Sequence, residues 1–365
     1  MERPCVLFVS AAPQSVGHVY RVTNHAERLR DQGLRVLVVE PEAAVAAMAA
    51  LPGLQAVVLF RPSPARDQLD QWRALCSQRK LRLLCDVDDL TFVPDLLDQG
   101  GWPYWNQLPE ANQQQWRQRF TAQRAALLAS DGVLVSTAAL AKAVQQLSLP
   151  VWVWPNGFGD LSWAISRHVR RQPRAAREGV LIGYASGTPT HAADFAVVAP
   201  TLARVLEAYP QVKLRVLGAL DLDQHPPLHR HRDRIDCQPV VPYALLPQQL
   251  AQFSINIAPL QMESRFCQAK SELKFFEAAA VGVPSVVSAT EPFESVVAHR
   301  QNGCLAFTAE DWWESLSWLV NHPSERDHLA KRALRTTRQR FSPRAQARDL
   351  NKLLKAGVFG VDPHG

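Results

Sequence analysis

The stretch that decides the fold is Lys270–Val287, KSELKFFEAAAVGVPSVV, in which a helical pattern gives way to a strand-like one. Its first part is rich in alanine and has charged residues at intervals, which favours an α-helix. Gly282 and Pro284 end this helix, because glycine is common at helix C-termini and proline cannot continue the hydrogen-bond ladder. The serine and valines that follow are typical of a short buried strand. A helix followed at once by such a strand predicts one repeat of a parallel α/β sheet.

The same alternation of apolar runs and helical patterns continues on both sides of this stretch. Strands are predicted at residues 5–10, 34–40, 56–60, 81–86, 132–136, 151–154, 180–185, 213–217, 235–237, 255–258, 285–288 and 304–307. Continuous apolar runs of this kind are typical of strands covered by helices on both faces. Helices are predicted at 25–32 and 113–129, and over 324–355 with a new start at Ser342–Pro343. The arginine-rich region 157–179 is expected to be an exposed linker.

Length and composition bound the class of protein. The 365 residues predict two domains, and 47% hydrophobic with 20% charged residues excludes a disordered chain. The net charge of +6 permits phosphate-bearing partners or an anionic membrane surface without requiring either. Six cysteines with no CxxC pair favour buried free thiols over a zinc site. With no long apolar run and no signal peptide in the sequence, we expect a cytoplasmic protein, with contact at the inner face of the membrane as a further option.

Charged residues in the opening stretch indicate a binding site. Lys270, Lys274 and Glu277 have the spacing i, i+4, i+7, which predicts that they share one helix face. Two lysines at a helix N-terminus would attract a diphosphate, and a glutamate could accept hydrogen bonds from ribose hydroxyls. The alternative is a solvated charged face with pairing along the helix. The very apolar residues around the three charges favour the binding site.

These residues also carry a resemblance. Lys-x-x-Glu before a small-residue helix and Gly-x-Pro resembles the donor-site signature of GT-B glycosyltransferases, in particular the retaining GT4 (glycosyltransferase group 1) family. Further segments agree with that family in order: 131–137, 155–157, 182–191, 214–218, 241–247, 257–260 and 302–303. The resemblance implies an α/β GT-B fold with two Rossmann-like, doubly wound domains facing each other across a cleft. Residues 1–158 would form the acceptor-side domain and 159–341 the donor domain, with a C-terminal helix at 342–357 packing back on the first.

The site residues follow from the resemblance together with the positions of polar groups after strands. Donor-binding residues are expected to be Gly183, Ser186, Gly187, Thr188, Tyr243, Ser271 and Glu277. Catalytic residues are expected to be Lys270, Lys274 and Asp88, the lysines stabilising the departing diphosphate. Acceptor-side residues are expected to be Gly17, His18, Arg21, Asp86 and Asp89.

Several of these residues have a structural alternative. The aspartates at 86–89 could bind acceptor hydroxyls or assist their deprotonation, or one of them could cap the next turn. Thr188 could be a helix N-cap, and His18 and His191 could be hydrogen-bonded bystanders. The aromatic segment 102–105 could be a platform for sugar rings or a local hydrophobic plug.

The resemblance implies glycosyl transfer from a nucleoside-diphosphate sugar to the hydroxyl of a glycan, lipid-linked or other acceptor. It implies retention of configuration, a place in polysaccharide synthesis and no obligatory metal or cofactor. Nucleic-acid binding is not expected, since no recognition module is present. Ala269 stands where many family members have a glutamate. This departure motivates a second hypothesis, a non-catalytic nucleotide-sugar-binding or scaffold protein, and a third, a sugar-nucleotide epimerase.

Overall fold

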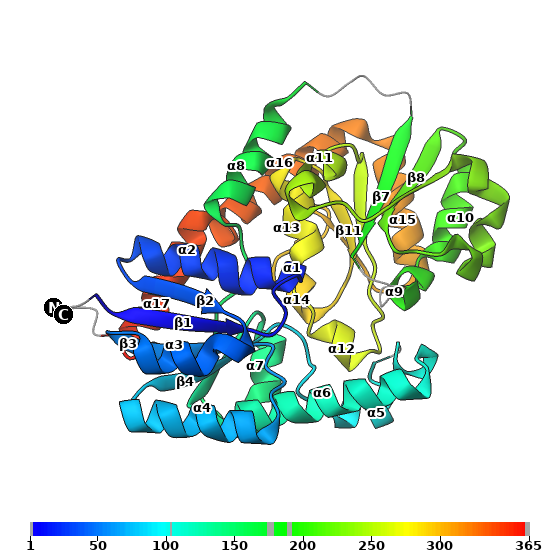
Figure 1. The fold of residues 1–365 in the computed structure, drawn as a ribbon. Helices are drawn as coiled ribbons and strands as arrows, with labels where there is room; N and C mark the ends of the chain where they lie inside the picture. The colour runs from blue at the N-terminus through cyan, green and yellow to red at the C-terminus, as the bar shows by residue number, and fades with distance from the viewer. Residues whose placement is uncertain (1–2, 103, 174–178, 188–191, 362–365) are drawn as a thin grey trace. The chain divides into compact units, whose positions relative to one another are not determined.

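The computed structural model describes residues 3–102, 104–173, 179–187 and 192–361. The chain divides into two compact units. Unit 1 consists of residues 1–160, 269–271 and 340–365, and unit 2 of residues 161–268 and 272–339. Each unit contains one six-stranded parallel sheet with helices packed around it (Figure 1). The predicted α/β fold with two doubly wound domains is therefore confirmed.

Unit 1 has the strand order β2-β1-β3-β4-β5-β6. Its strands are β1 (Cys5–Ser10), β2 (Arg35–Val39), β3 (Leu54–Phe60), β4 (Arg82–Val87), β5 (Gly132–Val135) and β6 (Val151–Val153). Its α-helices are α1 (Val16–His18), α2 (Asn24–Asp31), α3 (Ala44–Ala50), α4 (Arg66–Arg79), α5 (Asp95–Asp98), α6 (Glu110–Ala129), α7 (Ala138–Gln145) and α17 (Pro343–Lys355). A π-helical turn at Val19–Thr23 joins α1 to α2. Three side chains of this turn are buried: Tyr20, Arg21 and Val22.

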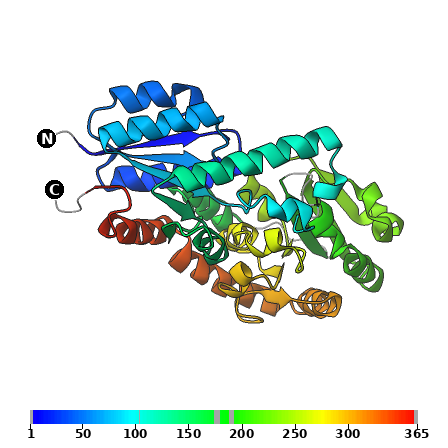
Figure 2. The ribbon, with the colours of Figure 1, turned by 90° about the horizontal axis from the view of Figure 1, so that it is seen from below.

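The core of unit 1 contains residues from both terminal regions of the chain. Leu29 of α2 and Leu350 of α17 pack in one buried cluster with Phe8 and Val58 of the sheet. Helix α17, red in Figures 1 and 2, lies beside α2 and covers the same sheet face. Ser342 caps α17 by accepting a hydrogen bond from the Ala345 backbone N–H. The serine–proline start predicted for this helix is therefore confirmed.

Unit 2 has the strand order β12-β11-β10-β7-β8-β9. Its strands are β7 (Val180–Ser186), β8 (Val212–Gly218), β9 (Ile235–Gln238), β10 (Ile255–Ala258), β11 (Ser285–Ser288) and β12 (Cys304–Ala306). Its helices are α8 (Asp160–Arg171), α9 (Ala192–Ala196), α10 (Ala199–Ala208), α11 (Leu246–Leu250), α12 (Arg265–Gln268), α13 (Leu273–Ala280), α14 (Glu291–Glu294), α15 (Ala309–Asn321) and α16 (Pro323–Arg340). Leu202 of α10 and Leu316 of α15 pack with Ile182, Val216 and Val286 of the sheet in one core.

The two strand orders place their switch points differently. In unit 1, β2 and β3 lie on opposite sides of β1, so the order reverses between β1 and β3. In unit 2, β8 and β10 lie on opposite sides of β7, so the order reverses between β7 and β10. Open parallel sheets bind ligands at the carboxyl ends of their strands beside such a point. These two edges are therefore where candidate site residues belong.

Every predicted strand is present, whereas the predicted linker at 157–179 is wrong for its first part. Residues 160–171 form helix α8. Leu161, Ile165 and Val169 recur every fourth residue, which gives this segment an amphipathic helical pattern despite its arginines. Residues 174–178 lie outside the described part of the chain.

Candidate functional site at the sheet edges

A buried ion pair fixes the carboxyl edge of unit 1. Arg21 Nε donates to Asp86 Oδ1 at 2.8 Å and Arg21 Nη2 donates to Asp86 Oδ2 at 2.9 Å. Both side chains have no exposed surface. The same guanidinium donates to the carbonyl oxygen of Trp154 and to Asn156 Oδ1. Burial raises the pKa of Asp86 to about 6, and the charge of Arg21 opposes that rise. This pair ties the turn after β1 to the ends of β4 and β6.

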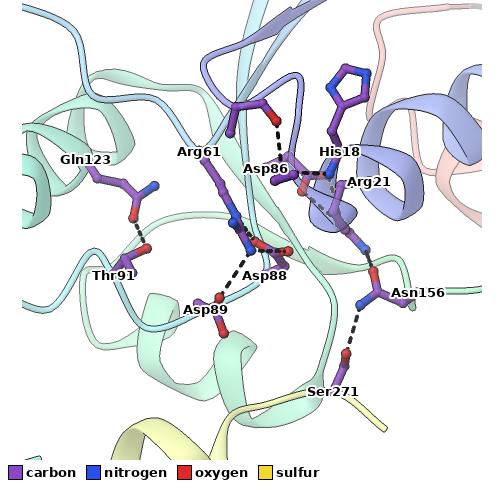
Figure 3. A network of polar contacts seen from close by, with 12 residues as sticks. His18, Arg21, Arg61, Asp86, Asp88, Asp89, Thr91, Gln123, Asn156 and Ser271 are labelled. Atoms are coloured by element: carbon purple, nitrogen blue, oxygen red, sulfur yellow. Dashed lines mark hydrogen bonds and ion pairs between the residues drawn. The ribbon is translucent and has the colours of Figure 1, made fainter. Parts of the chain in front are cut away.

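A second arginine holds the other two aspartates (Figure 3). Arg61 Nε donates to Asp88 Oδ1 at 2.6 Å, and Arg61 Nη2 donates to Asp88 Oδ2 at 2.8 Å and to Asp89 Oδ2 at 3.2 Å. Arg61 directly follows β3 with a φ of 45°, a left-handed conformation that is uncommon outside glycine. Its role was not predicted, although an arginine at the end of a buried strand is a signal that the sequence offers.

Gly17 allows this cluster to form. A Cβ at this position would lie 2.8 Å from Asp88 Oδ2 and 3.0 Å from Arg61 Nη2, closer than carbon and polar atoms normally approach. The Arg61 and Asp88 side chains thus lie close to the Gly17 backbone. Any contact of Gly17 with an acceptor stays a prediction.

Asp89 has the electrostatics of a proton acceptor. Burial and then the like charge of Asp88 raise the pKa of Asp89 to about 6, against the opposing charges of Arg61 and Lys270. Its side chain is 29% exposed, whereas the Asp86 side chain has no exposed surface. A carboxylate that titrates near neutral pH and reaches solvent can take a proton from a hydroxyl. Asp86, held by Arg21, lacks that access.

His18 is a second polar group at the β1–β3 switch point. Its Nδ1 lies 2.8 Å from Ser10 Oγ at the end of β1, and its ring packs edge-on against Phe60 at 6.4 Å between ring centroids. Burial lowers the pKa of His18, so the imidazole is neutral at pH 7. A neutral imidazole can exchange a proton or hydrogen-bond a sugar hydroxyl.

The segment 269–271 belongs to unit 1 although its neighbours in sequence belong to unit 2. Thr137 Oγ1 donates to the Ala269 carbonyl oxygen at 3.1 Å, and Asn156 Nδ2 donates to Ser271 Oγ at 2.8 Å. The prediction that Lys270, Lys274 and Glu277 share one helix face is wrong for Lys270, because α13 begins at Leu273, whereas Lys274 and Glu277 both lie on α13 with the spacing i, i+3. These hydrogen bonds hold the chain before α13 outside the helix.

A lysine lies near the carboxyl half of β7 in unit 2. Lys274 is in the first turn of α13, with its Nζ 5.9 Å from the ring centroid of Tyr184 on β7. Ser186, which is 3% exposed, ends β7, and Gly187 follows it; among the described residues, no atom lies within 4 Å of a Cβ built on Gly187. A lysine and the end of β7 thus lie on the side of the sheet where the β7–β10 switch point is found. Such groups can bind an anion such as a phosphate.

A buried carboxylate, that of Asp194, lies close enough to Tyr184 of β7 to affect its pKa. Asp194 of α9 is 1% exposed and accepts hydrogen bonds from Cys267 Sγ at 3.2 Å and Gln261 Nε2 at 3.4 Å. Burial, and then the charge of Asp194, raise the pKa of Tyr184 well above its usual value. Asp194 thereby connects α9 with α12. No pattern in the sequence pointed to Asp194.

Three further predicted donor residues, Gly183, Tyr243 and Glu277, lie on different elements of unit 2. A Cβ on Gly183 would lie 2.1 Å from the Phe253 ring, so packing requires glycine there. Tyr243 begins a short 3₁₀ turn after β9, and Glu277 is half-buried on α13. Thr188 and His191 lie outside the described residues. The ligand contacts of all five residues stay predictions.

The aromatic segment after β4 is a buried cluster. Trp102 is 5% exposed and stacks on Phe120 with 5.7 Å between ring centroids, and Trp116 meets it edge-on at 5.0 Å. Trp105 is also buried. This geometry matches the hydrophobic plug of the two alternatives.

Comparisons with known proteins agree with this architecture. Residues 200–352 match a family model described as "Glycosyl transferase-like". A comparison with curated protein sequences finds no match. A glycosyltransferase from Rickettsia africae has a TM-score of 0.69 at 10% identity, covering 99% of this chain and 100% of that one. HepE of Anabaena, described in complex with UDP-glucose, has a TM-score of 0.66 at 15% identity, covering 96% and 99%. Sucrose-phosphate synthase from Thermosynechococcus elongatus has a TM-score of 0.65 at 16% identity, covering 99% and 100%.

The chain therefore has the fold of GT-B glycosyltransferases, and its residues 200–352 match a glycosyltransferase-like family. The GT-B fold predicted from the signature around Lys274 is thus confirmed. None of the helices in the described part of the chain is long and apolar enough to cross a bilayer.

Proposed function

We propose that the protein transfers a glycosyl group from a nucleoside-diphosphate sugar to an acceptor hydroxyl. The observation that carries the proposal is the edge of unit 2 at the β7–β10 switch point. Lys274, in the first turn of α13, has its Nζ 5.9 Å from the ring of Tyr184, and Ser186 and Gly187 follow at the end of the same strand. Positioned cations and backbone groups stabilise a departing diphosphate without a metal ion. HepE, which shares the fold, binds UDP-glucose, so a uridine nucleotide is the first donor to test.

Unit 1 would supply the acceptor side. Asp89 and His18 are polar groups of unit 1 near the β1–β3 switch point. Arg61, which pairs with Asp89, is also held by Asp88. The raised pKa of Asp89 suits it to receive the acceptor proton near neutral pH. Lys270 lowers that pKa and would carry positive charge close to the departing diphosphate.

The test is UDP binding by calorimetry with turnover of a panel of UDP-sugars followed by mass spectrometry. Lys274→Ala should weaken UDP binding at least tenfold and reduce turnover further, because the departing diphosphate loses its cation. Lys274→Arg should restore part of both. Lys213→Ala is the matched control, since Lys213 is exposed on β8 of the same unit and should leave both unchanged. Equal effects of Lys274→Ala and Lys213→Ala would refute the donor site.

A non-catalytic binding protein is the second candidate, and Ala269 favours it. This residue is 3% exposed and lies where relatives of the GT4 type have a glutamate. A protein that binds UDP-sugars with no turnover on any acceptor, including water, would support this candidate.

The proposal also covers the stereochemistry of the reaction and the chemical class of the acceptor. We propose retention of the anomeric configuration and a glycan acceptor, free or lipid-linked, in polysaccharide synthesis. Proton NMR of the first product formed, before mutarotation, distinguishes an α from a β linkage. A product with inverted configuration would contradict this part alone.

Contact with an anionic membrane from the cytoplasmic side is a further part of the proposal. Burial, and then the charges of Arg338, Arg167 and Arg171, lower the pKa of Arg170, so α8 and α16 present clustered positive charge. Basic residues near such a surface contribute about 1 kcal/mol each. Vesicles with phosphatidylglycerol should sediment the protein, and Arg167→Glu with Arg171→Glu should abolish this. Equal binding to phosphatidylcholine vesicles would refute it.

A further inference from the structure

A chain of hydrogen bonds leads from the buried ion pair of unit 1 to Ser271 (Figure 3). Arg21, which Asp86 holds through Nε and Nη2, also donates from Nη1 to Asn156 Oδ1 at 3.3 Å. Asn156 Nδ2 in turn donates to Ser271 Oγ at 2.8 Å. All four residues belong to unit 1, because the segment 269–271 is part of that unit. Asn156 has no role in the transfer proposed above.

The guanidinium of Arg21 fixes the orientation of the Asn156 amide. A guanidinium only donates hydrogen bonds, so the atom of Asn156 that faces Arg21 is the amide oxygen. Asn156 is buried, and its backbone carbonyl oxygen accepts a hydrogen bond from Gln346 Nε2 at 3.5 Å. The amide cannot turn over without bringing its NH₂ group against the guanidinium. The NH₂ group therefore faces Ser271.

This orientation decides what the Ser271 hydroxyl can do. A hydroxyl has one proton and two lone pairs, and the Asn156 NH₂ group occupies a lone pair. The hydroxyl proton is therefore directed away from Asn156. Among the described residues, the Ser271 side chain makes no second hydrogen bond, and Ser271 is only half-buried. Its proton thus stays available to a hydrogen-bond acceptor on a ligand.

The main chain at the other end of this segment is held as well. Thr137 Oγ1 donates to the Ala269 carbonyl oxygen at 3.1 Å, and both residues are buried. Thr137 is itself fixed at the start of α7, where its side chain accepts from the Leu140 backbone N–H. Two anchors two residues apart restrict the segment before a ligand binds, so less ordering is needed on binding.

We propose that Asn156 is a positioning residue that directs the Ser271 hydroxyl, as a hydrogen-bond donor, toward the diphosphate of the glycosyl donor; this inference rests on the proposed function. Ser271 lies three residues before Lys274, and three residues span at most about 11 Å. A diphosphate offers only hydrogen-bond acceptors, so it needs donors around it. A hydroxyl that gave its proton to the protein would present lone pairs to the diphosphate instead. Asn156 prevents that arrangement.

The experiment measures the binding of UDP, GDP and ADP to the full chain by calorimetry, and the turnover of the matching nucleotide sugars by mass spectrometry. Asn156→Asp keeps the size of the side chain and an oxygen toward Arg21, but replaces the NH₂ group by a second oxygen. Ser271 would then have to donate to this carboxylate. We expect at least tenfold weaker binding, as for Ser271→Ala, because the diphosphate loses a charge-assisted hydrogen bond. Ser271→Thr, which keeps the hydroxyl, should restore most of the binding.

A double variant separates the direction of the hydroxyl from the added charge. Asn156→Asp also adds a negative charge, which would repel a diphosphate whatever Ser271 does. If Asn156 acts through Ser271, adding Asn156→Asp to Ser271→Ala should weaken binding by less than about threefold more. A further tenfold loss would overturn the proposal. Asn321→Asp is the matched control and should change neither binding nor turnover, because Asn321 Nδ2 also donates to a hydroxyl, that of Tyr209 at 3.1 Å, but lies at the end of α15.

Failure of this inference is distinct from failure of the proposed function. If a nucleotide binds and its sugar is turned over, but Asn156→Asp lowers only the free energy of unfolding, the role of Asn156 is structural and this inference alone is overturned. Unchanged binding in Ser271→Ala has the same meaning. If the wild type binds a nucleotide through Ser271 but turns over no nucleotide sugar, the positioning role stands and glycosyl transfer is overturned. Absence of binding of all three nucleotides would overturn both.

Discussion

The two sheet edges differ in how their charges are used. At the edge of unit 1, Arg21 and Arg61 are held by three aspartates, and the Arg21–Asp86 pair has no exposed surface. At the edge of unit 2, the Lys274 Nζ lies 5.9 Å from the centroid of the Tyr184 ring. The comparison teaches that fully buried, paired charges build the rigid edge of unit 1, whereas the edge of unit 2 holds a partly buried lysine near an aromatic ring.

The largest expected effect comes from breaking the buried pair of unit 1. Arg21→Ala should destabilise unit 1 by about 3–5 kcal/mol, because Asp86 stays buried without a partner. Hydrogen–deuterium exchange should show lost protection in β1 and β4, with β7 and β8 unchanged. The control is Arg230→Ala, which breaks an exposed pair with Glu207 and should cost less than about 1 kcal/mol. Comparable losses in both variants would mean that burial does not set the strength of the Arg21 pair.

The next effect is a pH dependence of unit 1. His25 stacks on Trp154 at 3.5 Å between ring centroids, and burial, then the charge of Arg21, lower the pKa of His25 well below its usual value. Below about pH 6.5 the unfolded state binds a proton that the folded state does not, so stability falls as pH falls. The expected slope is about 1.4 kcal/mol per pH unit for this one group.

Urea unfolding at pH 7, 6 and 5 measures this slope. His25→Phe keeps an aromatic ring against Trp154. Its loss of stability between pH 7 and pH 5 should be smaller than that of the wild type by about 2 kcal/mol, because the wild type takes up one additional proton on unfolding over the roughly 1.5 pH units below 6.5. A variant with the full wild-type slope would exclude His25 as its source.

A pair of matched glycine substitutions gives the smallest effect and tests the comparison most directly. Gly17→Ala should cost about 1–3 kcal/mol, since its Cβ would press on the Asp88 and Arg61 side chains. Gly187→Ala should change stability by less than about 0.5 kcal/mol, because its Cβ meets no atom of the described residues within 4 Å. It should nevertheless weaken UDP binding if that space belongs to the donor. Equal stability of the two variants would remove the distinction between a closed and an open edge.

Much of the fold could be predicted from the sequence because its strands are short and continuously apolar. The run at residues 255–258, for example, is found with the same bounds as β10. Helix α8 was missed because five arginines near Pro173 outweighed its apolar period in the sequence. The signature at 270–287 identified the class, since its residue types and order are specific in combination.

The partners of the site residues could not be predicted. Arg21 pairs with an aspartate 65 positions away, and Asn156 bonds a serine 115 positions away. No local pattern encodes such pairs, because they form only where parallel strands bring their carboxyl ends to one edge. The placement of Lys270 before rather than on α13 has the same origin, since hydrogen bonds from distant residues hold that segment.

The sequence by itself therefore determined the alternation of strands and helices, the two-domain organisation and the donor signature. Each of these depends on local hydrophobic period and residue type. Only the tertiary structure decided which charges are fully buried in pairs and which keep access to solvent. That distinction depends on burial and on partners far apart in the chain: Asp86 is fully buried against Arg21, while Asp89, three residues later, keeps access to solvent.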